Sequence, residues 1–233
     1  MNIDVLKRPA NAAAKIELDG GESIIAEGGS MIAMSDDMSV STSIHKRDGK
    51  GGGAGAFLKG LGRMLGGERM FMNEFTAGSK GGELYLSTTL PGDMEVIYLD
   101  GSKPVYVQKG SFVAHEQSID MNIHWGGLKN VFSGESLIWL KMEGTGHVVI
   151  NAFGAVYAVQ VDGDYIVDTG NVAAYEGSLE FKVTKAGKSL VGSFAGGEGF
   201  VCRFSGQGTV WCQTHADRMF GAKLTPFLTP KKQ

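Results

Sequence analysis

Cysteine is scarce in this sequence, with 2 residues among 233, and so is proline, with 5. Two cysteines are too few for the disulfide framework that stabilises small secreted domains. No apolar run approaches the roughly 18 residues that a membrane-spanning helix needs. The first ten residues include Asp4, Lys7 and Arg8, and they have too few apolar positions for a signal peptide. We therefore expect a cytoplasmic protein.

An excess of positive charge is also missing. The formal net charge is −3, which gives the chain as a whole no attraction to nucleic acid. Basic residues outnumber acidic ones between His45 and Arg69, where six lysines and arginines accompany two acidic residues. Phe57 and Phe71 are the aromatic residues of this region, which is few for stacking on bases. The sequence therefore argues against nucleic acid as a partner.

Glycine, by contrast, is abundant, with 36 residues that follow no collagen-like period. Such a content is typical of many tight turns between short strands. One motif occurs three times, as Leu18-Asp19-Gly20, Leu99-Asp100-Gly101 and Val161-Asp162-Gly163. Each copy continues through a second glycine, at positions 29, 110 and 170, into a segment in which apolar residues alternate. Self-similarity of this kind predicts three repeated β units.

The repeat also predicts the domain organisation. An apolar content of 42% suits one soluble domain over residues 1–233, with units at roughly 16–97, 98–159 and 160–213. Each unit should contain a hairpin at its Asp-Gly turn and another at Pro91-Gly92, Phe153-Gly154 or Ser205-Gly206. A unit this small cannot bury its own apolar face, so we expect the three units to share one core. The predicted fold class is all-β, a sandwich or prism with pseudo-threefold character.

The first unit carries a glycine-rich insertion at residues 47–67. Within it, seven residues follow the pattern of a helix with one apolar side and one basic side. The apolar side comprises Phe57, Leu58, Leu61, Met64 and Leu65, and the basic side comprises Lys59 and Arg63. Soluble proteins rarely leave so large an apolar surface in water. We predict that residues 57–65 form an interaction surface, covered either by the protein's own β core or by a subunit, a partner or a membrane.

The last part of the chain contains both cysteines. Cys202 and Cys212 lie five residues on either side of Gln207, so a hairpin centred there would place them directly opposite each other, near disulfide range. Two buried thiols in a reducing cytosol are nevertheless favoured over a disulfide. Beyond them, residues 214–233 form a C-terminal tail. The prolines at 226 and 230 predict that the end of this tail is extended.

Four ordered stretches carry a resemblance to a known family. They are LDGGESIIAEGGSMIAMS at 18–35, GAFLKGLGRMLGGERMFMNEF at 55–75, LPGDMEVIYLDG at 90–101 and TPFLTPK at 225–231. Together they resemble the altered-inheritance-of-mitochondria protein twenty-four family over nearly the whole chain. The resemblance implies a fold similar to the tryptophan RNA-binding attenuation protein, a short double-stranded β-helix type that assembles into symmetric oligomers. It implies no enzymatic reaction, and the mitochondrial branch of the family is linked to inner-membrane organisation.

Histidines are the first residues to consider as metal ligands, because double-stranded β-helix folds often hold metals. A cupin-like site needs two histidines one residue apart with a carboxylate nearby. The sequence has no such pair. His115 and His124 are nine residues apart, an odd separation that places them on opposite faces of a continuous strand, so they are weak candidates. We expect neither a metal nor a cofactor.

Nucleophilic catalysis has no sequence motif to support it. Ser30 and Ser111 follow the second glycine of their repeats, but Asn171 takes this place in the third, which indicates a turn former. Two hypotheses follow. The favoured one is a non-enzymatic assembly or scaffold protein that forms symmetric oligomers and docks residues 57–65 on a subunit, partner or membrane surface. The alternative is a metal-dependent or small-molecule enzyme that uses the β core, with His115 and His124 as its candidate residues.

Replacement of Leu61 and Leu65 by glutamate tests the predicted surface. Two carboxylates on the apolar helix face should prevent its docking, because a buried charge without a partner is costly. We expect smaller oligomers in light scattering and weaker flotation with liposomes. A double variant that keeps its fold, oligomer size and membrane behaviour would show that residues 57–65 are not the functional surface.

Overall fold

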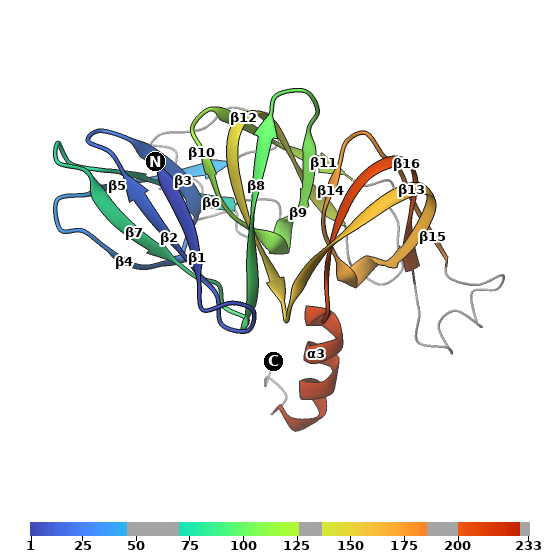
Figure 1. Ribbon diagram of the computed structural model, residues 1–233. Coiled ribbons are helices and arrows are strands. Elements are labelled where there is room, and N and C mark those ends of the chain that lie inside the picture. The colour runs from blue at the N-terminus through green and yellow to red at the C-terminus, as the bar shows by residue number, and fades with distance from the viewer. Residues whose placement is uncertain (46–69, 126–136, 186–199, 229–233) are drawn as a thin grey trace.

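The computed structural model describes residues 1–45, 70–125, 137–185 and 200–228 (Figure 1). Within these ranges the chain is almost entirely antiparallel β-structure, with one α-helix and three short 3-10 helices. The strands form one sheet of four, in the order β1-β2-β7-β4, and one of twelve. The predicted all-β class is therefore confirmed.

The first lobe of the fold is built from the N-terminal part of the chain. Its strands are β1 (Asn2–Leu6), β2 (Ala13–Leu18), β3 (Ser23–Glu27), β4 (Met31–Met34), β5 (Ser39–His45), β6 (Met70–Thr76) and β7 (Gly82–Leu86). β2 and β4 flank β7, whereas β3 and β5 flank β6. β1 adds to the free edge of β2. The lobe therefore consists of two short groups of strands, one around β7 and one around β6.

Two further lobes follow along the chain. The middle lobe contains β8 (Gly92–Asp100), β9 (Val105–Gln108), β10 (Phe112–Glu116), β11 (Ile119–Trp125) and β12 (Ile138–Phe153). The last lobe contains β13 (Val156–Asp168), β14 (Val172–Glu176), β15 (Glu180–Lys185) and β16 (Phe200–Gln213). The 3-10 helices η2 (Lys109–Ser111) and η3 (Thr169–Asn171) precede β10 and β14.

The same strand pairings occur in all three lobes. The second half of β12 pairs with β8 and β10, as β7 pairs with β2 and β4. Its first half pairs with β9 and β11, as β6 pairs with β3 and β5. β16 divides in the same way, with β13 and β14 on one half and β13 and β15 on the other. The pairing order thus recurs along the chain, while the pseudo-threefold axis stays a prediction.

Two of the predicted hairpins are wrong because the strands continue through them. β13 runs through Asp162 and Gly163, and β16 runs through Ser205 and Gly206, with Gly163 opposite Gly206. Both glycines have a positive φ, 104° and 113°. Glycine adopts this backbone conformation without steric cost, so it bends a strand without ending it. The two strands bend together and keep one continuous ladder.

The other predicted turns do end strands, but they do not form hairpins. The turn at Asp19 separates β2 from β3, and the turn at Asp100 separates β8 from β9. β2 pairs with β7 and β3 with β6, while β8 and β9 pair with successive halves of β12. Each Asp-Gly turn therefore carries the chain from one group of strands to the next.

The buried apolar side chains form three clusters in place of the single shared core that we expected. Phe75, Phe112 and Phe204 belong to the first, second and third cluster respectively. Each of the first two clusters also includes residues from the next lobe: Val113 of β10 lies in the first and Ala174 of β14 in the second. A small lobe can enclose its own core because its neighbour supplies the strand that closes it.

The described part of the C-terminal tail is helical from Asp217 to Phe227, so the predicted extended conformation is wrong at residues 225–227, and its remaining part from 229 onwards lies outside the described residues. Residues beyond β16 form the helix α3 (Asp217–Leu224) and the 3-10 helix η4 (Thr225–Phe227). Asp217 in the first turn of α3 and Lys223 in its last turn complement the helix dipole. Pro226 lies at the start of η4, where its missing N–H is not needed for a helical hydrogen bond.

Replacement of Gly92 by alanine tests the border between the first and middle lobes. A Cβ at this position would overlap the carbonyl oxygen of Ala152 on the paired strand β12. We expect Gly92→Ala to lower the free energy of unfolding by roughly 1–3 kcal/mol in chemical denaturation, since a packed backbone must shift to admit the methyl group. Gly110→Ala is the matched control, because a Cβ there meets no atom within 4 Å. Equal losses in both variants would contradict this account.

Candidate functional site

The two candidate histidines do not share a site. His115 on β10 is buried, and its Nδ1 lies 2.8 Å from the carbonyl oxygen of Glu116. His124 on β11 is exposed. They pair with Val148 and Trp139, which are nine positions apart on β12. In the part of the chain that the structure describes, no group of three His, Cys, Asp or Glu side chains is arranged to hold a metal ion.

A carboxylate–imidazole pair lies at the end of β10. The Glu116 carboxylate accepts a hydrogen bond from the backbone N–H of His147 at 3.1 Å and also contacts Nδ1 of the same residue. The Tyr98 ring lies 5.1 Å from the imidazole, between ring centres. At the same place in the last lobe, Glu176 accepts a hydrogen bond from the backbone N–H of Thr209 at 3.1 Å. Because Glu176 makes this contact without a histidine, the carboxylate serves to anchor the strand end.

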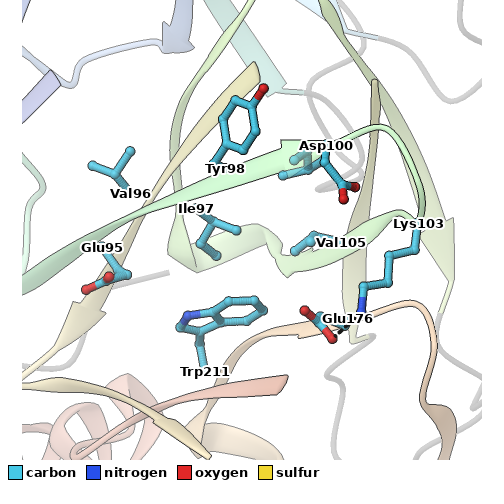
Figure 2. Close-up of a pocket in the computed structure, with 10 residues that line it drawn as sticks. Glu95, Val96, Ile97, Tyr98, Asp100, Lys103, Val105, Glu176 and Trp211 are labelled. Carbon is cyan, nitrogen blue, oxygen red and sulfur yellow. Dashed lines mark hydrogen bonds and ion pairs between the residues drawn. The ribbon is translucent and has the colours of Figure 1, made fainter. Parts of the chain in front are cut away.

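A cleft of about 290 Å³ lies between β8, β14 and β16 (Figure 2). The Trp211 ring lines the cleft between Glu95 on one side and Lys103 and Glu176 on the other (Figure 2). Lys103 Nζ lies 2.8 Å from a Glu176 carboxylate oxygen, and Arg8 lies 2.8 Å from a Glu95 carboxylate oxygen. These charges are therefore already paired within the protein. The volume lies just below the range for ligand pockets, about 300–1,000 Å³.

Strand β4, in the first lobe, exposes consecutive apolar side chains. Met31, Ile32 and Met34 are 43%, 57% and 36% exposed. One edge of β4 pairs with β7, and none of the described strands pairs with its other edge. We call Met31–Met34 the β4 edge. An open strand edge with apolar side chains is a ready template for pairing with another strand.

A second open edge lies on β13. Tyr165 and Ile166 are 42% and 48% exposed. β13 pairs with β16 along one side, and no other described strand pairs with residues 163–167. We call these residues the β13 edge. Figure 1 shows β4 and β13 at opposite ends of the molecule.

The C-terminal helix carries a third apolar surface. Met219, Phe220 and Leu224 of α3 are exposed, as is Phe227 of η4. Phe220 packs against Phe153 of β12 at 5.3 Å between ring centres, which holds one side of the helix to the β-structure. The sequence patterns predict no helix at residues 217–224, which fall only within the expected C-terminal tail.

The predicted interaction surface cannot be compared with these exposed edges. Its residues, Phe57, Leu58, Lys59, Leu61, Arg63, Met64 and Leu65, lie outside the described part of the chain. The surface at 57–65 therefore stays a prediction. The β4 edge was missed, although its signal, four consecutive apolar residues from Met31 to Met34, is present in the sequence.

Comparison with known proteins identifies the family. The family model described as mitochondrial biogenesis AIM24 matches residues 3–215. The chain belongs to the AIM24 family. This confirms the resemblance found in the sequence. An uncharacterised protein of Streptococcus pyogenes serotype M6 is 29% identical to this AIM24-family chain over 218 residues, which cover 92% of the chain and 86% of the relative.

A solved structure shares the fold of this AIM24-family protein. The X-ray structure of a Streptococcus pyogenes protein superimposes with a TM-score of 0.77 and covers 97% of this chain and 99% of its own. The two sequences are 24% identical, so the likeness concerns the fold alone. Within its described residues, the AIM24-family chain has no helix that is both long and apolar enough to span a membrane.

The two cysteines are buried, free thiols. Both lie on β16, opposite Val167 and Tyr157 of β13, so the predicted cross-strand opposition of Cys202 and Cys212 is wrong. The hairpin that would have paired them does not exist because β16 continues through Gly206. Burial disfavours the charged thiolate, so it raises the pKa of both thiols, that of Cys212 to about 11.

Both thiols should be inert towards a thiol reagent at about pH 8, because a raised pKa leaves little thiolate and the side chains are buried. Unfolding in guanidinium should release two reactive thiols per chain. Lys182→Cys supplies the control, since Lys182 is 76% exposed on β15 and a thiol there should react at once. Fast reaction of the native cysteines in the folded protein would contradict the conclusion that both thiols are buried and have raised pKa values.

Proposed function

We propose that this AIM24-family protein is a non-enzymatic assembly protein that forms symmetric oligomers and acts through its surfaces. The β4 edge is the observation that supports this most directly. Residues 57–65 are proposed as a further docking surface, on a subunit, a partner or a membrane. In this proposal the β-structure is a scaffold that holds binding edges in fixed positions.

The composition of the β4 edge supports a binding role. Natural proteins protect exposed sheet edges with lysine, proline or other charged residues that discourage pairing. The β4 edge has none of these, whereas β1, at the other edge of the same sheet, carries Asn2 and Asp4. One edge of the four-stranded sheet is thus protected and the other is suited to a partner.

The enzyme alternative has less geometric support among the described residues. His115 is buried within β10 and His124 lies on a different strand, so they do not converge on one ion. Elemental analysis of the purified protein distinguishes the two functions. Stoichiometric metal that is lost in the His115→Ala and His124→Ala double variant would favour the metal-dependent enzyme.

The substitution Ile32→Glu tests the assembly function. We expect the wild-type protein to be oligomeric and the variant to have a lower mass in size-exclusion chromatography with light scattering, because an unpaired carboxylate resists burial against a partner. Tyr98→Glu is the matched control, since Tyr98 is also exposed but lies on β8, away from both edges.

Both variants should keep the wild-type circular dichroism spectrum, because neither side chain contributes to a buried cluster. A wild-type chain that is monomeric throughout the micromolar range would contradict the proposed function.

A further inference from the structure

The three bulged strands β4, β10 and β14 hold equivalent places in their lobes. β4 pairs with β7, β10 with the second half of β12, and β14 with the second half of β16. All three ladders shift register at the second residue of the bulged strand. Ala33, Ala114 and Ala174 directly follow this shift, so they occupy one equivalent position.

The bulged strands differ at their second edge. β10 pairs there with β3, and β14 pairs there with β9. The two pairings share one register, with Ala114 opposite Ala26 and Ala174 opposite Val107. Among the described strands, nothing pairs with the second edge of β4.

The strand equivalent to β3 and β9 is the second half of β13. β3 pairs with β6, β9 with the first half of β12, and residues 163–167 with the first half of β16. In these ladders Ala26, Val107 and Val167 take one equivalent position. β3 and β9 each bind a bulged strand at the other edge, whereas the β13 edge is open in the described part of the chain.

Burial of the side chains follows this pattern of pairing. Val113 of β10 and Ala173 of β14 are fully buried, whereas the equivalent Ile32 of β4 is exposed. On the complementary strands, Ile24 of β3 is fully buried, whereas the equivalent Tyr165 of β13 is exposed. β4 and β13, whose second edges no described strand pairs, therefore expose the side chains that their equivalents bury.

We propose that the β4 edge pairs with the β13 edge of a second copy of this chain. The register carried over from the two internal pairings places Ala33, Met34 and Ser35 opposite Val167, Ile166 and Tyr165 of the partner subunit, in that order. This inference rests on the proposed function and names its partner. One chain cannot make the contact with itself in this structure, because β4 and β13 lie at opposite ends (Figure 1).

The pairing would repeat a sheet that the chain already contains. Within the chain, β5, β6 and β3 continue through β10 into β12 and β8. Between copies, β15, β16 and β13 would continue through β4 into β7 and β2, with β1 as the last strand. The contact joins two different surfaces head to tail, so it produces a closed ring when the rotation between copies closes and a filament when it does not.

The chemistry of the two edges suits this contact. The β4 edge is entirely apolar, and three of the five residues of the β13 edge, Tyr165, Ile166 and Val167, are apolar as well. Asp164 is the charged residue of the β13 edge, and its carboxylate accepts a hydrogen bond from Ser205 Oγ at 2.5 Å within its own lobe. Pairing would therefore bury apolar side chains on both sides and satisfy the backbone groups of both edges.

A disulfide between two separately produced variants tests the register. Met34→Cys protein is mixed with Ile166→Cys protein and oxidised, since residues directly opposite each other have Cβ atoms about 4.5–5.5 Å apart, near the geometry of a disulfide. The control mixes Met34→Cys with Lys182→Cys, because the Lys182 side chain is 76% exposed on β15, away from the β13 edge, and lies opposite Arg203 and not opposite a cysteine. The native cysteines are buried and should not compete.

We expect a disulfide-linked dimer in the first mixture and no such dimer in the control mixture. Ile166→Asp should also lower the oligomer mass, as Ile32→Glu does. If the wild type is oligomeric and Ile32→Glu dissociates it, but neither the disulfide nor the Ile166→Asp effect is observed, the inference is overturned and the assembly function stands. A wild-type monomer, including one in which residues 46–69 of the same chain cover β4, overturns both the β4–β13 pairing and the assembly function.

Discussion

Edge-to-edge pairing of a bulged strand is the interaction on which the rest of this structure depends. β10 and β14 each use one edge within their own lobe and the other with a strand of the preceding lobe. The same contact pairs backbone N–H and C=O groups and closes an apolar core, as Val113 does for the first cluster and Ala174 for the second. At the outer edge of β4, neither requirement is met by any strand in the described ranges. The fold, the exposed apolar row and the proposed assembly therefore have one physical origin.

The sequence predicted the strands and their order more accurately than their connections. Recurring Asp-Gly motifs correctly placed strand ends near Asp19 and Asp100. The same motif at Asp162 and Gly163 lies inside a strand, because Gly163 and the opposite Gly206 bend two paired strands together. A motif specifies the local backbone angles, but the partner strand decides whether the ladder continues. The prediction of a single core was wrong for a related reason. The sequence of one lobe does not show that a strand of the next lobe will close its core.

The open β4 edge was harder to predict than the fold, because its exposure depends on tertiary contacts. Residues 31–33 and 112–114 carry the same apolar pattern, yet Ile32 is exposed and Val113 is buried. These three residues do not distinguish the two cases, since the difference in burial lies in whether a described strand pairs with the second edge. The histidine argument assumed a continuous strand, but His115 and His124 belong to β10 and β11. Composition could indicate an unusual apolar stretch, and only the arrangement of strands could indicate which of its edges is open.

The covalent connection between lobes has a consequence for concentration dependence. β3 with β10 and β9 with β14 are pairings within one polypeptide, so dilution does not separate them, and each strand faces its partner at a high effective concentration. The second edge of β4 has no such tether to a described strand. If each lobe were a separate polypeptide, each of these strand pairings would have to form between two molecules that meet in solution. In the proposed assembly, three lobes on one chain leave one strand pairing, that of β4 with β13 of another copy, subject to mass action, so the fraction of chains that form it would rise with protein concentration.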